Sequence, residues 1–389
     1  MAYTPANPNA YDTNLIPVEI RAEYFKETLL LSPLSMFMGN NSQAIIQVRN
    51  LNDGSGLTSD FTFSRNIDYK NPIIGYDQIS GKGALMEFYT DRVTVDQQAI
   101  PDRLYGVELT KLSTPVKVFD RMKPLLQEAH NQNLVYSLLA SATIGSYAPT
   151  GVPGAYVAPT ATGPRTNRYV YGFNRVSDNN ISAGIDAMAV AGPGTNAAPG
   201  DGLSVRHIRK LRNMAIYGGG SFEQEKRISP YRLKTVEGFA SPYYAYFMDT
   251  PSYESLEQDT DWAVYNGRGF KEMANQPTAL SGSFFKGQID NILVYEVPEL
   301  GNFQVTSANG TKASWNLFCG AEAFGLVWAK EPWFTQEWSN HHTVVEQAVI
   351  EVRGQKALKF PSFNPTLNAG NSRSVLVENG IIHSFVRLD

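Results

Sequence analysis

The stretch Ser113–Ser146, STPVKVFDRMKPLLQEAHNQNLVYSLLASATIGS, carries the longest helical pattern of the chain. Seven side chains recur along it at alternating spacings of three and four, which places them on one face of a helix: Phe119, Met122, Leu126, Ala129, Asn133, Tyr136 and Ala140. Pro124 lies within the run and cannot donate a backbone hydrogen bond. We weigh a kinked helix that starts near Pro115 against a helix capped by Asp120 with Pro124 in its first turn, and favour the second. Asp120–Ala142 would then span roughly 33 Å, enough for other layers to pack along it.

The composition is that of an ordinary globular protein, with 389 residues of which 42% are hydrophobic and 18% are charged. A formal net charge of −4 argues against tight binding of duplex DNA through neutralised phosphates. The single cysteine, Cys319, excludes an internal disulfide, and the apolar run around it predicts a buried core thiol. No apolar run approaches the roughly 20 residues of a membrane helix, and the N-terminal sequence lacks the features of a signal peptide.

Upstream of the long helix, the pattern is an arm followed by two separated strands. Residues 1–16 are rich in Pro and Asn and read as an extended arm. Strand patterns follow at Ala44–Val48 and Asp60–Ser64, and another begins near Phe88, with Val93 and Val95 as its apolar positions. Two strands joined across Arg65–Leu85 make a hairpin far longer than the usual two to five residues.

The segment between those strands has no sustained period. Ordering about twenty residues costs on the order of 20–40 kcal/mol, which its own apolar side chains cannot recover alone. A neighbouring subunit could supply the missing surface; the alternative is a mobile loop. On the first interpretation, six side chains contact the neighbour: Ile67, Tyr69, Ile73, Ile74, Tyr76 and Ile79.

Downstream of the long helix, Ser146–Asp201 is dominated by small and polar residues, with one aromatic island at Asn167–Phe173, and reads as a surface connection or insertion. A helix follows at Leu203–Ile216, and Gly218–Gly220 marks its stop. A short helix is expected at Tyr253–Gln258. Strands are expected at Tyr243–Met248, Asn291–Val297, Ser314–Phe318, Gly325–Ala329, Val344–Val352, Ala357–Phe360 and Ile381–Arg387.

No catalytic or ligand-binding constellation can be read from the chain. The Gly-rich stretches do not complete a phosphate-binding loop, and no G-x-S-x-G elbow is present. The five histidines, His130, His207, His341, His342 and His383, lack the spacing of a metal site and are expected in solvated loops. We therefore expect no enzyme activity, no cofactor and no metal.

Two clusters of opposite charge stand out. Four basic residues decorate the helix at Leu203–Ile216, and four acidic ones fall in the short helix and turn beyond Tyr253. Such clusters are most often solvated faces. The sharper hypothesis is that they pair between subunits, where opposed charge fixes orientation. The residues concerned are Arg206, Arg209, Lys210, Arg212, Glu254, Glu257, Asp259 and Asp261.

The order of these elements resembles that of the major capsid proteins of tailed bacteriophages, which share the fold named after phage Hong Kong 97. The local resemblance is to the podovirus capsid proteins of the phage N-four type. It is carried by GYDQISGKGALMEFYTDRVTVDQ (Gly75–Gln97), followed by the long helix and then, in the same order, by Tyr243–Leu256, Gln288–Pro298 and Cys319–Trp338.

The resemblance implies an α+β fold with six parts. These are residues 1–59 as the N-terminal arm and first strand, 60–100 as an extended loop hairpin, 101–145 as a peripheral domain with a long spine helix, 146–202 as a variable surface insertion, 203–298 as the remainder of the peripheral domain and the start of the axial domain, and 299–389 as the strand-rich axial domain with the C-terminal strand. The loop hairpin would lie over the adjacent subunit.

The resemblance also implies a structural role: self-assembly into pentamers and hexamers of an icosahedral head that encloses double-stranded DNA. Expected partners are further copies of the chain, a separate scaffolding protein, a portal protein, a decoration protein and weakly held DNA, with no membrane. The protein would be located in the virion capsid after assembly in the host cytoplasm. Three alternatives remain: an encapsulin-like compartment shell, a tail-fibre or adhesin protein, and a hydrolase.

Overall fold

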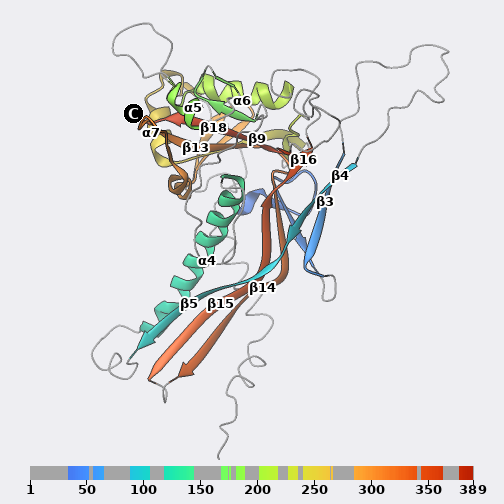
Figure 1. Cartoon of the computed structure of the whole chain (residues 1–389), viewed down its shortest axis with the longest axis vertical. Helices are drawn as coiled ribbons and strands as arrows, with labels where there is room; N and C mark the ends of the chain where they lie inside the picture. The colour runs from blue at the N-terminus through green and yellow to red at the C-terminus, as the bar shows by residue number, and fades with distance from the viewer. Residues whose placement is uncertain are drawn as a thin grey trace, which may run out of the picture.

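The computed structural model describes residues 34–51, 56–64, 88–105, 118–143, 168–173, 175–176, 181–188, 201–217, 227–234, 240–262, 264–265, 284–339, 343–361 and 376–388. Two sheets and a long helix organise these residues (Figure 1). An upper unit is built on the larger sheet, and a narrower unit extends downward from it. Helix and sheet both contribute, so the α+β class predicted from sequence is confirmed.

The smaller sheet has five strands in the order β1-β2-β14-β15-β5. β14 and β15 are long antiparallel strands, and β5 pairs antiparallel with β15 over ten residue pairs. The strand bounds are β1 Met38–Gly39, β2 Ile46–Asn50, β14 Phe324–Ser339, β15 Val344–Ala357 and β5 Asp96–Tyr105. The short helix η1, Ser35–Phe37, precedes β1.

The long helix, α4, runs from Val118 to Thr143 and packs along β15 and β5. We call α4 together with β5, β14 and β15 the blade, which extends downward in Figure 1. α4 begins at Val118, so Asp120 lies inside the helix and the capped start that we favoured is wrong. Pro124 is also internal, which a helix accepts when packing outweighs one lost hydrogen bond.

The buried face of α4 differs in part from the expected stripe. Leu126 and Ala140 are buried as predicted, whereas Asn133 and Tyr136 are only half-buried. From Leu134 onward the helix is buried on nearly every side, because the two sheets meet around it. A single stripe describes a helix with one partner, and the second half of α4 has two.

The larger sheet has nine strands, with the order β10-β11-β9-β13-β18-β6-β7, while β12 pairs with β13 and β8 pairs with β9. The bounds are β6 Tyr169–Tyr171, β7 Arg175–Val176, β8 Tyr231–Lys234, β9 Ala240–Met248, β10 Phe285–Ile289, β11 Ile292–Glu296, β12 Val305–Thr306, β13 Lys312–Cys319 and β18 Ile381–Arg387. The short helix η3, Pro298–Phe303, links β11 to β12.

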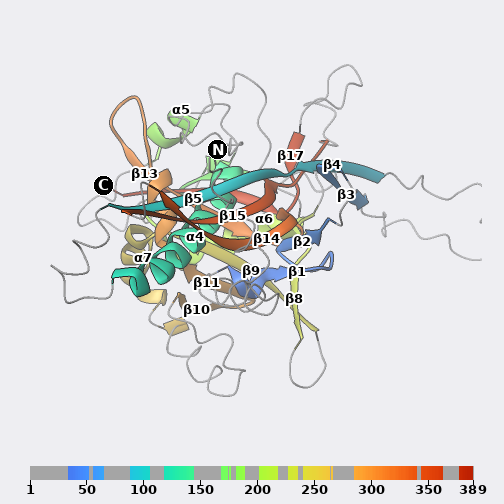
Figure 2. The ribbon, with the colours of Figure 1, turned by 90° about the horizontal axis from the view of Figure 1, so that it is seen from below.

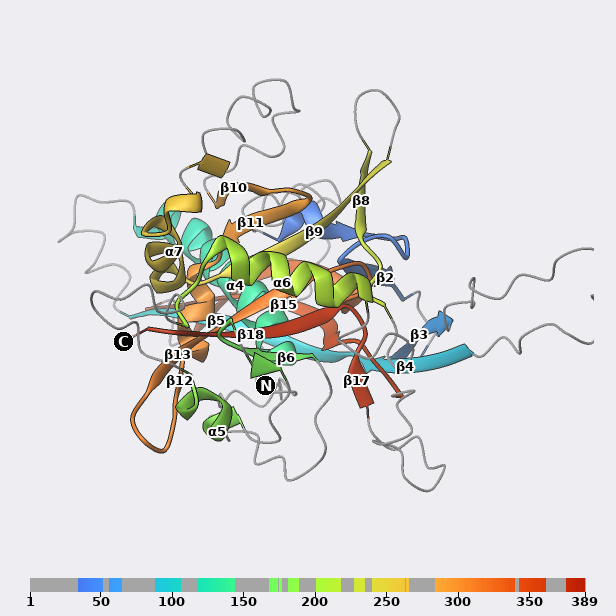
Figure 3. The same cartoon turned by 90° about the horizontal axis from the view of Figure 1, so that it is seen from above.

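Both faces of the nine-stranded sheet are covered, which explains its nearly continuous apolar strands. Tyr246 and Val294 point to one face, beneath the amphipathic helix α6 (Val205–Tyr217), which crosses the sheet in Figure 3. Phe247 and Tyr295 point to the other face, toward α4. Two shorter helices, α5 (Ile181–Asp186) and α7 (Thr250–Glu257), complete the upper unit.

The predicted surface insertion at 146–202 is wrong for its middle part. β6 lies within the nine-stranded sheet, parallel to β18, and Tyr171 is fully buried. The aromatic island therefore marks a strand of the core rather than an exposed connection. The other domain ranges stay a prediction, but β13 and β18 pair in the same sheet as β9 and β11, so the boundary at 298/299 passes through that sheet.

A two-stranded ribbon, β3 (Thr58–Ser64) with β4 (Phe88–Thr94), projects from the side of the molecule near the short pair β16 (Lys359–Pro361) and β17 (Leu376–Glu378) (Figures 1 and 2). Both strands of the ribbon were predicted. Val93 and Val95 are buried as expected, but Phe88 is 62% exposed. Phe88 has the opposite parity to these two valines, so it points to the other face of the ribbon.

Gly354 of β15 allows the chain to cross at the junction of β4 and β5. A Cβ at this position would lie 2.1 Å from the backbone oxygen of Thr94. We expect Gly354→Ala to destabilise the subunit by about 1–3 kcal/mol, because backbone must move to admit the methyl group. Urea unfolding measures this, with Gly301→Ala as control, since nothing lies within 4 Å of a Cβ at Gly301. Equal unfolding midpoints for the two variants would contradict the crossing.

Candidate functional site

The most distinctive site on the chain is the base of the β3–β4 ribbon, where a segment that leaves the body is fixed to it. Four ribbon side chains are buried against the corner formed by β14, β15 and β16: Phe61, Phe63, Val93 and Val95. Burying a side chain of this size contributes about 1.5–3 kcal/mol, so the four together outweigh any surface ion pair. The apolar contacts therefore hold the ribbon in place.

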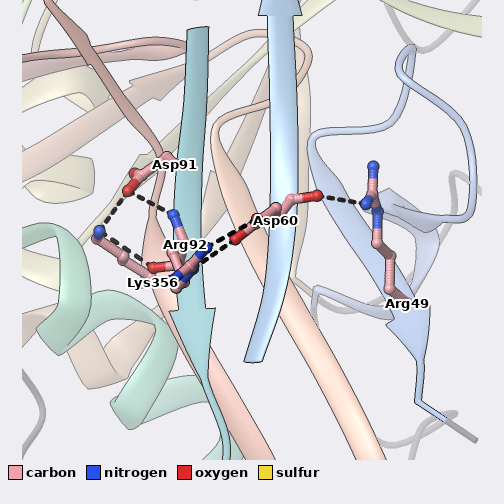
Figure 4. A network of polar contacts seen from close by, with 5 residues as sticks. All are labelled: Arg49, Asp60, Asp91, Arg92 and Lys356. Carbon is pink, nitrogen blue, oxygen red and sulfur yellow. Dashed lines mark hydrogen bonds and ion pairs between the residues drawn. The ribbon is translucent and has the colours of Figure 1, made fainter. Parts of the chain in front are cut away.

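Polar contacts orient the same base (Figure 4). Arg92 donates two hydrogen bonds to the carboxylate of the cross-strand Asp60, at 2.7 and 3.1 Å, and Arg49 of β2 donates to the backbone oxygen of Asp60 at 2.5 Å. The hydrogen bond from Arg92 lowers the pKa of Asp60. Arg49 also lies 4.5 Å from the centre of the Phe61 ring. Arg49 thus ties β3 to the body, and the Arg92–Asp60 pair ties β3 to β4.

A second polar contact ties β4 to the end of β15. Asp91 accepts a hydrogen bond from Lys356 (Figure 4). It accepts another, at 2.9 Å, from the backbone nitrogen of Lys359. Lys356 further donates to the backbone oxygen of Arg92 at 3.3 Å. Because Asp60 and Asp91 are bound from opposite sides, the ribbon leaves the body in a fixed direction. The six loop side chains assigned to the neighbouring subunit, residues 67 to 79, lie outside the described residues.

The basic cluster on α6 finds partners within its own chain. Asp290, in the turn between β10 and β11, pairs with Arg209 at 3.2 Å and with Arg212 at 2.9 Å. Lys210 donates to the backbone oxygen of Phe173, and Arg206 lies 5.0 Å from the centre of the Phe173 ring. These contacts fasten α6 to the two ends of the sheet.

One residue of the acidic cluster also has a partner within the chain, and the other three are exposed. Asp259 accepts a hydrogen bond from the backbone nitrogen of Val205 at 2.8 Å, at the first turn of α6. Glu254, Glu257 and Asp261 are exposed. The structure thus brings the two clusters near each other within one subunit, and the pairing between subunits remains a prediction for the exposed members.

Three histidines expected in loops are buried instead: His130, His207 and His383. His207 lies 2.7 Å from the hydroxyl of Ser384, and burial lowers the pKa of His207 to about 4, so the ring is neutral at pH 7. Both residues are fully buried, so this serine–histidine pair is closed to substrate. His341 and His342 lie outside the described residues.

His383 belongs to a buried cluster with Trp315, Tyr169 and Glu378. Trp315 donates to Nδ1 of His383 at 3.0 Å, and Nε2 lies 3.7 Å from Glu378. Burial disfavours the carboxylate, but His383 and Lys359 outweigh this and lower the pKa of Glu378 to about 2. Cys319 is buried as predicted, and burial raises the pKa of its thiol.

The lowered pKa of Glu378 predicts a dependence of stability on pH. The folded-state pKa is below the ordinary value of 4.5, so this contribution is complete above pH 4.5 and is lost as the pH falls toward 2. We expect Glu378→Gln to flatten the fall of the urea midpoint between pH 5 and pH 3. The exposed Glu331→Gln is the control, and equal slopes for Glu378→Gln and the unmodified protein would contradict the assignment.

A buried polar network that the sequence did not reveal joins α4 to β15. Glu351 contacts His130 at 2.8 Å and Arg353 at 2.9 Å. Arg353 in turn donates to Asn133 at 2.6 Å and to Ser137 at 3.0 Å. Burial opposes the ionisation of Glu351, but Arg353 and His130 outweigh it, and the pKa of Glu351 is lowered.

Neither a group of metal ligands nor a membrane-spanning helix is found in the described part of the chain. Among these residues, no three His, Cys, Asp or Glu side chains gather as metal ligands would. None of the described helices has the length and apolar content needed to cross a bilayer. The prominent features of the described residues are the β3–β4 ribbon with its buried base, the blade, and the nine-stranded sheet, which is covered on both faces.

The comparisons with known proteins bear on the fold. No family model and no curated protein matches the sequence. Solved structures do match over nearly the whole chain. The capsid of Ralstonia phage GP4 is 18% identical, with a TM-score of 0.64 and coverage of 91% of this chain and 90% of that one. The capsid of cyanophage Pam1 is 15% identical, with a TM-score of 0.62 and 92% of each chain covered.

A third match is the capsid of the Helicobacter pylori bacteriophage KHP30, at 13% identity and a TM-score of 0.59, with 92% of this chain and 90% of that one covered. Three capsid structures from phages of different hosts thus share one architecture with this chain. The capsid fold that the order of elements implied is confirmed.

Proposed function

We propose that this chain is the major capsid protein of a tailed bacteriophage, a structural protein without enzyme activity that assembles into the pentamers and hexamers of an icosahedral head around double-stranded DNA. The observation that carries the proposal is the match of the fold, over about nine-tenths of the chain, to phage capsid proteins. The protein would be located in the virion, after assembly in the host cytoplasm.

The ribbon supports this role. The β3–β4 ribbon projects from the body on a buried base, and its strands end at Ser64 and Phe88, the residues that border the segment 65–87. That segment carries the six apolar residues named above, whose burial on a neighbouring copy would offset the cost of ordering it. In a closed shell, symmetry repeats each such contact many times, so a modest interface suffices.

The proposed partners follow from the same role. The chain would assemble with further copies of itself, around a separate scaffolding protein and a portal protein, and it could carry a decoration protein. Contact with the packaged DNA would be weak and nonspecific, in keeping with a net charge of −4. Sedimentation velocity tests the self-association: large, fast-sedimenting particles support the proposal, and one slow species at all concentrations opposes it.

The exposed members of the two charge clusters are proposed to pair between subunits. Arg209 and Lys210 make an internal ion pair and an internal hydrogen bond, whereas the internal contact of Arg206 is with the ring of Phe173, so Arg206 and Glu254 give the cleaner test. We expect Arg206→Glu to slow assembly several-fold at low salt and less at high salt, because salt screens exposed charges. Adding Glu254→Arg should restore the rate, and light scattering measures it.

The exposed Arg232→Glu is the matched control, since Arg232 lies on β8, away from both clusters. Unaltered assembly of the Arg206→Glu variant at both salt concentrations would refute the pairing.

A further inference from the structure

The contact between α4 and β15 has three zones along the helix. At the far end of the blade, Leu126 packs with Val349 in a small apolar cluster. At the near end, Leu134, Leu138 and their neighbours belong to the main core. The network around Glu351 lies between these two clusters, and both His130 and Glu351 are almost completely buried. We call His130, Asn133, Ser137, Glu351 and Arg353 the polar layer.

One row of α4 is apolar except at His130. Leu126, Leu134, Leu138 and Ala142 fall in this row with His130, at intervals of four residues. A slide of the helix by one turn, about 5.4 Å, that brings Leu134 to the place of His130 would also bring Leu138 to the place of Leu134. The same slide would place His130 in the apolar cluster of Leu126 and Val349, and the shorter Ala142 at the place of Leu138.

The hydrogen-bond partners of Arg353 discriminate only weakly between the two positions of α4 along β15. Asn133 and Ser137 accept its hydrogen bonds now. After a slide that brings Leu134 to the place of His130, Ser137 and Ser141 would stand opposite Arg353, and both are hydroxyl side chains. His130 is the polar residue of the row, and the slide would both move it into the apolar cluster around Val349 and set a leucine against the buried carboxylate of Glu351.

We propose that the pairing of His130 with Glu351 is a register key, which holds α4 at one position along β15 against a one-turn slide. A buried carboxylate that faces leucine keeps Arg353 but loses the imidazole partner in a site from which water is excluded, so the shifted position is disfavoured. Single buried polar groups set helix register in this way in coiled coils. On the two strands paired with this part of β15, Asp96 of β5 lies opposite Arg353 and Lys330 of β14 lies opposite Val352, and both are exposed.

The register key extends the proposed function, because a shell repeats the same contacts in many copies and needs α4 at a reproducible position in each of them. The blade extends from the upper unit, and a slide of α4 along β15 would change the surface that the blade presents to other copies. This consequence for assembly rests on the proposed function, whereas the register itself can be measured on single subunits.

The test moves the key by one turn. In the double variant His130→Leu/Leu134→His, the leucine row is preserved and the imidazole is placed one turn later. Spin labels at Gln132→Cys on α4 and Tyr105→Cys at the far end of β5 report the position of the helix, since both sites are exposed. Cys319 is buried and remains unlabelled. We expect the distance between the labels to shorten by about one turn, roughly 5 Å, relative to the unmodified protein.

Leu134→Met, with His130 in place, is the matched control and should keep the original distance. An unchanged distance in the double variant would show that apolar packing sets the register and would overturn the proposal. If the double variant does not fold, His130→Leu/Glu351→Leu/Arg353→Met removes the layer with apolar residues of similar size. Two distances about 5 Å apart are then expected, and one narrow distance equal to the original would overturn the proposal.

The register measurement needs no shell and is made on dissociated subunits. If the protein proves not to form a capsid but the distance between the labels still shortens in the double variant, the register key is supported and only the proposed function fails. The two failures can therefore be told apart.

Discussion

Removing Asn66–Gly83 should give a subunit that folds with an unchanged unfolding midpoint but forms no stable particles. The shortened ribbon is joined by Arg65 and Ala84–Glu87, a five-residue connection within the usual range for hairpins. Ser64 and Phe88 are paired at the end of β3 and β4, so the connection has a short distance to cross. The base of the ribbon, with Phe61 and Val93 in the core, is left intact.

The physical reason is that the deletion removes the surface that we assign to the neighbouring copy. Full burial would contribute about 1.5–3 kcal/mol for each of the six apolar side chains of the segment. A symmetric shell repeats this contribution in every copy. Size-exclusion chromatography and electron microscopy measure the particle fraction, and chemical unfolding measures the fold.

The matched control keeps the length of the loop and changes only its chemistry. One variant replaces the six apolar side chains by Ser, and the other replaces six polar ones, Asn66, Asp68, Lys70, Asn71, Asp77 and Gln78. The first should fail to assemble and the second should assemble. Normal particles from the deletion, or equal failure of both serine variants, would count against the role of the apolar side chains.

Truncation of Glu351 is expected to have the largest effect on the subunit itself. Glu351→Ala leaves Arg353 buried without its carboxylate partner and removes the contact of His130. Breaking a buried ion pair from one side costs about 3–5 kcal/mol, a large share of the stability of an ordinary domain. Urea unfolding of dissociated subunits measures the loss.

The exposed Glu331→Ala on β14 is the control and should change the free energy of unfolding by less than about 0.5 kcal/mol. If Glu351→Ala costs no more than this control, the polar layer is not a structural element of the blade. His130→Leu and Glu351→Leu combined with Arg353→Met should recover part of the loss, because apolar replacement of all three partners removes the unpaired charge.

Local pattern in the sequence predicted the elements well where one force dominates. Ile381–Arg387 was predicted as a strand with the bounds of β18, because its apolar run is bordered by turn residues. α6 was predicted within two residues, since its single buried face gives a clear period. The start of α4 was wrong because the cost of an internal proline was overestimated against tertiary packing.

Pairings between distant segments were beyond the sequence. The contact of His130 with Glu351 joins residues 221 positions apart, and no local pattern encodes it. A signal was nevertheless present on each side. Glu351 and Arg353 share the parity of the buried Val349, and His130 interrupts a row of leucines. Charged residues that alternate onto the same face of a strand as buried apolar residues indicate a buried polar network. This signal argued against the prediction that His130 lies in a solvated loop.

The candidate site was predictable in part. The ribbon strands and the apolar loop between them followed from alternation and length. The fixed base did not, because Asp60 and Asp91 read as ordinary exposed carboxylates until β2 and β15 are placed beside them. The charge clusters were correctly located on helices and turns, whereas their internal partner Asp290 lies in a turn that no charge pattern marks.

Electron microscopy of the purified, assembled protein tests the central claim most directly, which is that this chain builds a closed shell from many copies of itself. Polyhedral particles of uniform diameter, with rings of five and six subunits, are the predicted result. Elongated fibres, or small oligomers at every concentration with residues 65–85 packed against their own subunit, would contradict it.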